Sequence, residues 1–390
     1  MGASSLKIRG GEVFLVALPI RRPHHWVGHS ARIGEGYIVL RLDVENGVSG
    51  WGETQVLGTW GGDHETRYGE APRMAALALR EILLPAITGH EVTDVQALHM
   101  RMSKVLRGHP YAKAAIDVAA HDAIGKSYGI PVYQLLGGKV RDSISVAHSI
   151  GLMDIEAAAK EAEAVVADGI KTIKIKIGID PKRDVDIVAA VRKVVGPDIQ
   201  IRVDANQGYA SWRQALAVVG RLAEYGIAYV EQPVEGLRGM AEVSARCNVP
   251  VMADESSWSA SDVLEIIRLN AAQMLSVYYT KPGGFSPAKR LLAVAGAGAL
   301  QCDVNGSAEM GIGNAANLHL AVSSPEVVLA GSIPVTSTAE QVVTKVGARL
   351  YLDDLIKQPF RYADGQLFVP DGPGLGIEVD EEKISKYRIG

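Results

Sequence analysis

Two lysines lie two residues apart in the segment KTIKIKIG, which otherwise has the composition of a buried β-strand; they are Lys174 and Lys176. Successive side chains of a strand point to opposite faces, so both lysines project to one face near the C-terminal end of the strand. An ammonium group is costly among apolar side chains unless it is paired or lies at an opening. Because a strand end can also extend charges into solvent, the meaning of this pair depends on the residues around it.

Three acidic residues follow later apolar runs. Asp204, Glu231 and Asp254 lie 27 and 23 residues apart, close to the length of one strand–helix repeat. Converging carboxylates cannot all remain ionised without a counter-charge, and an oxygen-only set of ligands without His or Cys suits Mg²⁺ or Mn²⁺. Each acid could instead cap the helix that follows, but three such caps at successive strand ends would be a coincidence. The spacing therefore predicts a divalent-metal site.

A metal ion and a lysine in one site indicate a class of reaction. The cation would lower the pKa of both Lys174 and Lys176, because it disfavours their charged form. A lysine whose pKa lies closer to neutrality can act as a general acid or base. A proton α to a carboxylate is weakly acidic, and a metal ion that stabilises the enediolate makes its removal possible. The sequence thus indicates proton transfer next to a carboxylate.

These side chains need elements that bring them together. Eight short apolar runs recur at intervals of roughly 22 to 28 residues, mostly separated by Ala-rich helical segments. The runs begin at Ser143, Lys171, Ile199, Ile227, Val249, Gln273, Ala299 and Glu326. Alternating strands and helices predict an α/β fold with a parallel sheet, and eight strands predict a closed barrel with its active site at the C-terminal strand ends. A doubly wound sheet is the alternative, but no G-x-G-x-x-G follows the first strand.

The sequence pattern changes along the chain. Residues 5–55 have strand patterns with a hairpin signal at ENG, and residues 68–128 have apolar residues at helical spacing, which together predict an α+β unit. We expect this unit at residues 1–135, the barrel at 136–350, and a C-terminal segment at 351–390 that returns to the first unit.

The composition argues against several classes of protein. A formal charge of −4 over 390 residues leaves no basic stripe, so nucleic-acid binding is not expected. No apolar run approaches the ~20 residues that span a bilayer, and the N-terminus lacks the pattern of a signal peptide. Cys247 and Cys302 are too few for a disulfide framework or a cysteine metal site. A cytoplasmic enzyme is the expectation.

Five motifs resemble those of the enolase superfamily, specifically the muconate-lactonizing subgroup of the mandelate racemase/muconate lactonizing family: KIKIG, RVDANQGY, EQP, MADES and GSAEMGIGNAANLHLA. The likeness extends to RRPHHWVGHS, GWGET and GLGI, and so covers nearly the whole chain. It implies a modified TIM barrel, (β/α)7β, beneath an N-terminal α+β capping domain. It also implies a homo-oligomer, a small-molecule carboxylate substrate, and Mg²⁺ or Mn²⁺ as cofactor.

The resemblance also implies a role for individual residues. The three spaced acids would bind the metal, supported by Asn206 and Glu255. Lys176 would be the acid/base, with Lys174 lowering its pKa. Glu309 matches the seventh-strand glutamate of the lactonizing enzymes.

One position departs from the pattern. Relatives that work on both faces of the α-carbon place a lysine at the end of the sixth strand, five residues before a glycine pair, and counting back from Gly283 gives Tyr278. Lys281 matches another lysine that some relatives have beside the catalytic one, so we do not expect it to be the base. Because Tyr278 is a hydrogen-bond donor at neutral pH, we expect it to orient the substrate. This departure argues against the prediction of a racemase or epimerase.

Two loops of the capping domain would close over the substrate, Arg22 to Ser30 and Gly58 to Glu65. In them His24, Trp26 and Trp60 offer flat and polar surfaces to an organic acid, although the tryptophans could equally pack into the core. No Asp-x-Asp follows the eighth apolar run, and relatives that bind a substrate ammonium carry that feature, so dipeptide epimerisation is disfavoured.

The favoured function is a divalent-metal-dependent cycloisomerase of a muconate-like dicarboxylate. The alternative is a racemase, epimerase or dehydratase of a carboxylate such as an amino-acid or hydroxyproline derivative. A non-catalytic barrel that keeps the metal site as a binding module is a third hypothesis, and the intact lysine pair beside three metal ligands argues against it.

Overall fold

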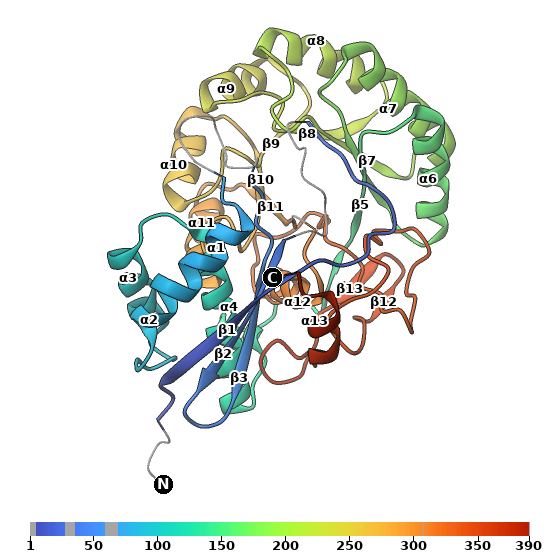
Figure 1. The fold of residues 1–390 in the computed structure, drawn as a ribbon. Helices are drawn as coiled ribbons and strands as arrows, with labels where there is room; N and C mark the ends of the chain where they lie inside the picture. Colours follow the sequence, from blue (N-terminus) through green and yellow to red (C-terminus); the bar gives the residue numbers. More distant parts are fainter. Residues whose placement is uncertain (1–4, 28–35, 59–68, 307, 390) are drawn as a thin grey trace.

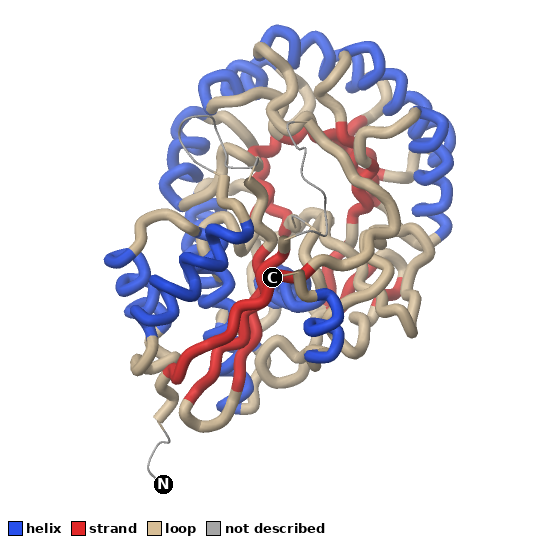
Figure 2. The backbone as a smooth tube through the Cα atoms, in the orientation of Figure 1, coloured by secondary structure: helices blue, strands red, loops and turns tan. Residues whose placement is uncertain are grey.

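The computed structural model describes residues 5–27, 36–58, 69–306 and 308–389. A curled sheet of parallel strands ringed by helices forms the larger part of the molecule, and a three-stranded antiparallel sheet with its own helices lies beside it (Figure 1, Figure 2). Within these ranges, none of the helices is long and apolar enough to cross a membrane.

In the described ranges the curled sheet has seven parallel strands, each hydrogen-bonded to the next in sequence order. They are β5 (Ala147–Ile150), β6 (Thr172–Lys176), β7 (Gln200–Asp204), β8 (Ile227–Glu231), β9 (Val251–Ala253), β10 (Met274–Val277) and β11 (Gln301–Val304). Apolar side chains of these strands, such as Ile173, Ile175 and Val203, are fully buried, as expected of parallel strands that helices cover.

The register of this sheet sets the candidate site residues at one height. Lys176 on β6 pairs with Asp204 on β7, and Asp204 pairs with Glu231 on β8. One step lower, Lys174 pairs with Arg202. The site residues of three neighbouring strands therefore lie side by side at the C-terminal edge of the sheet.

The eighth predicted strand, which begins at Glu326, does not form a regular strand. Val327 makes one parallel bridge to Cys302 of β11, and Gly331 makes one to Val146 beside β5. The backbone N–H groups of residues 328 and 329 both donate to the carbonyl of Cys302, so a regular ladder cannot continue. A Cβ on Gly331 would lie 2.6 Å from the Val304 carbonyl oxygen, which shows how closely the backbone approaches there. The expectation of a regular eighth strand is thus wrong, whereas the predicted modified barrel is confirmed.

Seven helices follow the barrel strands and cover the outside of the sheet in the described chain (Figure 1). They are α6 (Ile155–Ala167), α7 (Pro181–Val195), α8 (Trp212–Ala223), α9 (Leu237–Arg246), α10 (Ala260–Leu269), α11 (Phe285–Ala297) and α12 (Gly311–Val322). Side chains of Asp154, Asp180, Ser211 and Ser259 accept backbone N–H groups at the starts of α6, α7, α8 and α10. These caps fix where four of the helices begin.

The capping domain places three antiparallel strands against a long helix. Its strands are β1 (Ile8–Val16), β2 (Tyr37–Val44) and β3 (Ser49–Thr54), and its helices are α1 (Pro72–Ala78), the π-helical turn η1 (Leu79–Leu83), α2 (Leu84–Ile87), α3 (Val95–Val105), α4 (Pro110–Tyr128) and α5 (Val132–Leu135). A side chain at Gly50 or Gly52 would clash with the α4 carbonyl groups of Ala119 and Ala115. The two glycines on β3 therefore allow α4 to pack directly on the sheet, and α4 is almost entirely buried.

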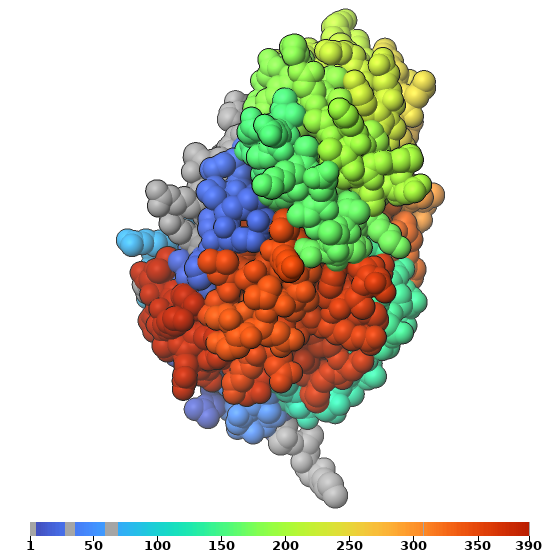
Figure 3. Space-filling model, turned by 90° about the vertical axis from the view of Figure 1, so that its right-hand side faces the viewer, coloured from blue at the N-terminus to red at the C-terminus, as the bar shows by residue number. Residues whose placement is uncertain are grey.

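The C-terminal segment touches both parts of the molecule. Two short strands, β12 (Tyr362–Ala363) and β13 (Gln366–Phe368), form a sheet with β4 (Ser143–Ser145). The last helix, α13 (Glu381–Tyr387), lies next to β1, where the Ala17 N–H donates to the Tyr387 carbonyl at 3.0 Å. In Figure 3 the orange and red residues of the C-terminal part of the chain form one block below the green barrel residues. The residue boundaries of the three parts stay a prediction.

A buried carboxylate joins the capping domain to the barrel. Asp117 on α4 accepts the backbone N–H of Phe285, at the start of α11, at 2.6 Å, and His99 Nε2 at 2.7 Å. Burial alone would raise the pKa of Asp117, but the neighbouring His121 and His99 outweigh it and lower that pKa. Asp117 therefore holds the turn that follows β10 through charge-assisted hydrogen bonds.

We expect Asp117→Asn to lower the free energy of unfolding by about 2–3 kcal/mol, because a neutral amide weakens the charge-assisted bonds of a buried group. Since the pKa of Asp117 is lowered by folding, its stabilisation is present above the ordinary carboxyl pKa near 4 and fades as the pH falls below that value. Urea unfolding at several pH values measures both effects. Asp198→Asn, at an exposed site, should change the stability by less than about 0.5 kcal/mol; equal losses in the two variants would contradict this account.

Candidate active site

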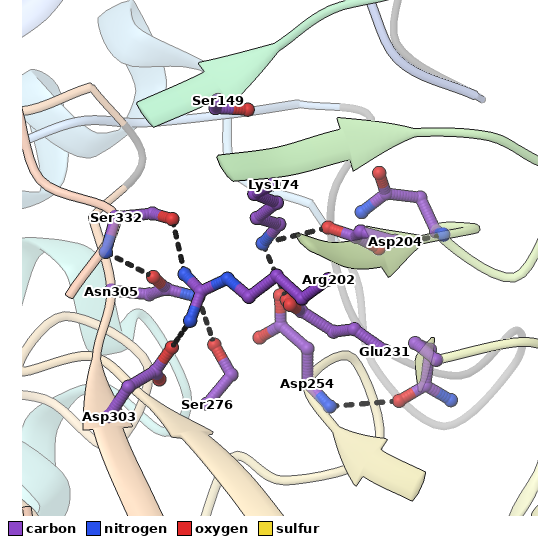
Figure 4. A network of polar contacts seen from close by, with 12 residues as sticks. Ser149, Lys174, Arg202, Asp204, Glu231, Asp254, Ser276, Asp303, Asn305 and Ser332 are labelled. Carbon is purple, nitrogen blue, oxygen red and sulfur yellow. Dashed lines mark hydrogen bonds and ion pairs between the residues drawn. The ribbon is translucent and has the colours of Figure 1, made fainter. Parts of the chain in front are cut away.

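The residues that the sequence singles out converge at the C-terminal ends of β6 to β9 (Figure 4). Lys174 and Lys176 come from β6, Asp204 and Glu231 end β7 and β8, and Asp254 directly follows β9. All five side chains are buried. Regular strand spacing and the sheet register are what place them together.

Lysine and carboxylate groups alternate through the centre of the site. Lys174 Nζ lies 2.8 Å from Asp204 Oδ2 and 2.7 Å from Glu231 Oε1. Lys176 Nζ donates to Asp204 Oδ2 at 2.6 Å and to Asn206 Oδ1 at 2.7 Å. Each lysine is thus fixed in position by groups on the neighbouring strands.

The carboxylates around Lys174 act on its charge. Burial on its own would lower the pKa of this ammonium, but Asp204 and Glu231 outweigh burial and raise the pKa instead. The expected lowering concerns the effect of a bound cation and stays a prediction. Lys174 is the positive charge that pairs with these two acids.

Asn206 and Glu255 form a second row behind the lysines. Asn206 donates through Nδ2 to Glu255 Oε1 at 2.9 Å and, through its backbone N–H, to Asp204 Oδ1 at 3.0 Å. Burial and the nearby Asp254 raise the pKa of Glu255 to about 8. Asn206 therefore contacts both Glu255 and Lys176, and its supporting role for the metal ligands stays a prediction.

Asp254 is held by Lys281 and Tyr278. Lys281 Nζ lies 2.7 Å from Asp254 Oδ1 and also donates to the carbonyl oxygens of Asp254 and Ser276 at 2.9 and 2.8 Å. Tyr278 donates its hydroxyl to Asp254 Oδ2 at 3.3 Å. Burial, followed by the charge of Asp254, raises the pKa of Tyr278 well above its ordinary value. Tyr278 is therefore a hydrogen-bond donor to Asp254 in this structure, and its expected role in orienting the substrate stays a prediction.

Sequence reasoning missed a buried arginine below these residues. Arg202 is fully buried, and its guanidinium contacts Asp303 Oδ2 at 3.1 Å and the Ser332 hydroxyl (Figure 4). It also contacts the Tyr229 hydroxyl and the Ala330 carbonyl. It stands two residues before Asp204, so the rule that pairs the two lysines on one strand face would also have found it. Arg202 closes the floor of the site with a positive charge.

Glu309 and Glu53 lie beside the start of α12. Glu309 is buried, and a side chain at Gly306 would clash with its carboxylate, so Glu309 lies against that cavity-lining glycine. Glu53 accepts the backbone N–H groups of Met310 and Gly313 at 2.7 and 2.8 Å. Glu53, which the sequence did not single out beyond the GWGET motif, thus holds the backbone on both sides of the helix start.

The donor set fits a hard divalent cation by its chemistry. The buried acids at these strand ends are Asp204, Glu231, Asp254, Glu255 and Asp303, and the buried bases are Lys174, Lys176, Arg202 and Lys281. The acids therefore outnumber the bases, and Glu231 Oε2 is buried without a hydrogen-bond partner in the described chain. Burial and the charge of Asp204 raise the pKa of Glu231 well above its ordinary value. A divalent cation would stabilise the ionised forms of these crowded acids.

The carboxylates do not already meet at one point. In the described part of the chain no three acidic, histidine or cysteine side chains lie close enough together to enclose a metal ion. Lys174 bridges Asp204 and Glu231, while Lys281 holds Asp254. The lysines thus keep the three acids at neighbouring strand ends in defined positions.

A cavity of about 110 Å³ opens onto the site. Its lining from the barrel strands includes Lys174, Lys176, Asn206, Asp254 and Tyr278. His24 and Trp26 line it from the capping domain, and the Trp26 ring lies 5.6 Å from Lys176 Nζ. Trp60 and the loop around it lie outside the described residues, as does part of the loop that begins at Arg22. The prediction for Trp60 therefore stays a prediction.

The curled barrel, the capping domain and the lysine–carboxylate site define a class of enzyme, and comparison with known families agrees. The chain matches the model described as enolase C-terminal domain-like over residues 157–383, and the model of the mandelate racemase/muconate lactonizing enzyme N-terminal domain over residues 10–137. The chain therefore belongs to the mandelate racemase/muconate lactonizing enzyme family of the enolase superfamily, in its muconate-lactonizing-like subgroup. The predicted family is confirmed.

Individual relatives catalyse different isomerisations. The chain is 32% identical to muconate cycloisomerase 1 of Rhodococcus opacus, over 98% of this chain and 99% of that one. It is 31% identical to N-succinyl-L-Arg/Lys racemase of Bacillus cereus, over 98% of each. The crystal structure of a muconate lactonizing enzyme from Pseudomonas fluorescens, complexed with muconolactone, superposes with a TM-score of 0.88 at 28% identity, covering 99% of this chain and 100% of that one. The chain is accordingly an isomerase of this superfamily.

We expect Glu231→Gln to weaken Mn²⁺ binding at least tenfold, because an amide is a poorer ligand than a carboxylate for a hard cation. The fold should survive, since the pKa of Glu231 is already raised by burial and glutamine has the same shape. Calorimetric titration with Mn²⁺ and a thermal melt measure the two effects. Glu224→Gln, an exposed control, should bind Mn²⁺ as the wild type does; unchanged binding by Glu231→Gln would remove Glu231 from the ligand set.

Proposed function

We propose that this enzyme is a divalent-metal-dependent isomerase that transfers a proton at the carbon α to a carboxylate, on one face of that carbon only. Cycloisomerisation of a muconate-like dicarboxylate is the reaction that we favour. Family membership supports the coarser part of the proposal, because enzymes of this family in general depend on a divalent metal ion.

The observation that carries the proposal is that β6 and β10 do not supply equivalent acid/base groups to the cavity. Lys174 and Lys176 line the cavity, whereas Lys281 does not. Lys281 Nζ donates instead to two backbone carbonyls and to Asp254. The sixth-strand position that would carry a second lysine holds Tyr278, whose pKa is raised. One ammonium that can exchange a proton with a substrate therefore faces the cavity from β6, and no lysine matches it on β10.

Lys176 is assigned the proton transfer and Lys174 the positioning. Lys174 bonds two carboxylates at 2.8 and 2.7 Å, and the raised pKa of Lys174 keeps it charged. Among the described acids, Lys176 forms an ion pair with Asp204 and none with Glu231. The Trp26 ring lies next to the Lys176 ammonium. Lys176 therefore lies where it can reach the cavity while Asp204 and Asn206 fix its direction.

The metal would be held by Asp204, Glu231 and Asp254. When bound, a divalent cation supplies Lewis-acid stabilisation for the negative charge that develops on the substrate carboxylate. Lys176 would take the α-proton as a neutral amine or return it as an ammonium, and Tyr278 would donate a hydrogen bond that orients the substrate. The buried Lys281 keeps Asp254 in place, and the buried Arg202 bonds Asp303 below the site. Burial of the whole site strengthens each of these charge interactions.

A racemase or epimerase is the second candidate. It is favoured by the 31% identity to N-succinyl-L-Arg/Lys racemase over almost the full chain, a likeness as extensive as that to muconate cycloisomerase 1. Such a reaction needs an acid/base on each face of the carbon, so Tyr278 would have to exchange protons with the substrate. The two candidates therefore differ in what Tyr278 does.

We expect Lys176→Ala to lower kcat by about 10²–10⁴, the usual contribution of a positioned general base. The measurement is metal-dependent exchange of substrate α-protons with D₂O, followed by NMR for muconolactone and for N-succinyl amino acids. Lys171→Ala, an exposed change at the start of the same strand segment, should exchange at the wild-type rate. Native exchange by Lys176→Ala would assign the proton transfer to another residue.

We expect Tyr278→Phe to retain most of kcat and to raise KM several-fold, because it loses one neutral hydrogen bond to the substrate or to Asp254. Steady-state kinetics with the same substrates measure the split between kcat and KM. If kcat instead falls as far as in Lys176→Ala while substrate binding is kept, Tyr278 is a second acid/base. The racemase would then be the better assignment.

A further inference from the structure

A cluster of basic residues lines the same cavity away from the lysine–carboxylate network. Arg21 and Arg22 follow β1, and both contact the carboxylate of Glu161 on α6, Arg21 at 3.4 Å and Arg22 through Nε at 3.0 Å. His148 on β5 adds a third contact to the same oxygen, Glu161 Oε1, at 2.7 Å. Arg349, from the segment before the last strands, completes the cluster. Glu161 is thus the acid that three neighbours share.

The two histidines of this cluster are neutral. The backbone N–H of Ala348 donates to His148 Nδ1 at 2.8 Å, so His148 carries its proton on Nε2. Arg22 can only donate, and it lies 3.2 Å from His24 Nδ1, which makes that nitrogen the acceptor. Burial is the largest cause that lowers the pKa of both histidines. The cluster therefore contains three arginines and one carboxylate, and it has an excess of positive charge.

Two of the arginines keep donors that the described protein does not use. Arg22 is engaged throughout, because its terminal nitrogens contact Glu161, the Pro23 carbonyl and the Ser149 carbonyl. Arg21 uses Nε for the Arg349 carbonyl at 3.0 Å and one terminal nitrogen for Glu161. Arg349 uses only Nε, toward the Tyr351 carbonyl at 3.3 Å. In the described chain, the second terminal nitrogen of Arg21 and both of Arg349 have no protein acceptor.

We propose that Arg21 and Arg349 form a subsite for a second carboxylate of the substrate, remote from the carbon that reacts. The two guanidinium groups are close enough for Arg349 to lower the pKa of Arg21 by repulsion. An anion placed between them relieves that repulsion, and the planar guanidinium fork suits a carboxylate. Both residues line the cavity that contains Lys176. The inference rests on the proposed function in one respect, since Lys176 and the metal ligands would hold the reacting carboxylate.

The alternative is that the arginines only fasten the capping domain to the barrel. Arg22, through Glu161 and Ser149, already makes that connection between the segment after β1 and the barrel. Arg349 adds a single weak bond within its own segment, so a fastening role does not account for its terminal nitrogens. A fastener and an anion subsite also differ in what their loss changes: stability in the first case, and preference for a second negative charge in the second.

Binding of matched diacids and monoesters tests the subsite. Butanedioate, hexanedioate and octanedioate are each compared with their monomethyl esters, which keep the length and lose one charge, by calorimetry on the Mg²⁺-loaded enzyme. We expect the preferred diacid to bind the wild type about 10- to 100-fold more tightly than its ester, the range given by charge-assisted hydrogen bonds. Arg349→Gln and Arg21→Gln should each reduce this preference at least about fivefold while leaving the affinity for the ester within twofold. Lys160→Gln, an exposed loss of one positive charge on α6, should leave the preference unchanged.

Each outcome decides the question. If no diacid of the series binds more tightly than its ester, or if Arg349→Gln weakens diacid and ester equally, the subsite does not exist. If Lys160→Gln and Arg349→Gln lose the preference for the diacid equally, that preference comes from long-range charge. This result also rejects the subsite. Metal-dependent α-proton exchange of the same compounds, followed separately, tests the proposed function: a diacid preference without exchange rejects the proposed α-proton transfer alone, and exchange without a preference rejects the subsite alone.

Discussion

The structure depends on the neutralisation of charges that the barrel buries together. Isolated, a buried carboxylate or ammonium would cost several kcal/mol, and the strand ends hold acids and bases within hydrogen-bond distance of one another. Lys174 bridges Asp204 and Glu231, and Lys281 forms an ion pair with Asp254. Since the acids still outnumber the bases, the site favours a cation. The charge balance thus links the stability of the barrel to its chemistry.

The capping domain contributes to this balance from outside the barrel. Its buried Asp117 fixes the backbone where α11 begins, a few residues beyond Tyr278 and Lys281. Its Glu53 fixes the start of α12 next to Glu309. Both links place a carboxylate on helix N–H groups, an arrangement that the helix dipole stabilises. The cap is therefore part of the scaffold of the site, in addition to lining the cavity through His24.

The residues that come together in the site could be predicted from the sequence wherever a simple rule of strand geometry applies. They could not be predicted where a side chain has several possible hydrogen-bond partners. Residues two apart on a strand share a face, and one strand–helix repeat returns the chain to the same height; these rules bring Lys176, Asp204 and Glu231 together. The ion-pair partners of Lys174 could not be predicted, because they depend on which of several groups lies nearest in three dimensions. The irregular eighth strand was missed for a similar reason, since its apolar run matches the others and the ladder is interrupted where residues 328 and 329 share the Cys302 carbonyl.

The central claim is that a proton moves on one face of the substrate carbon. The most direct measurement is the reaction of muconolactone with the Mg²⁺-loaded wild-type enzyme in D₂O, with NMR assignment of the two hydrogens on the methylene group next to the free carboxylate. A single acid/base on the Lys176 side predicts that one of these hydrogens is replaced by deuterium and the other is retained. Exchange of both hydrogens at comparable rates would contradict the account.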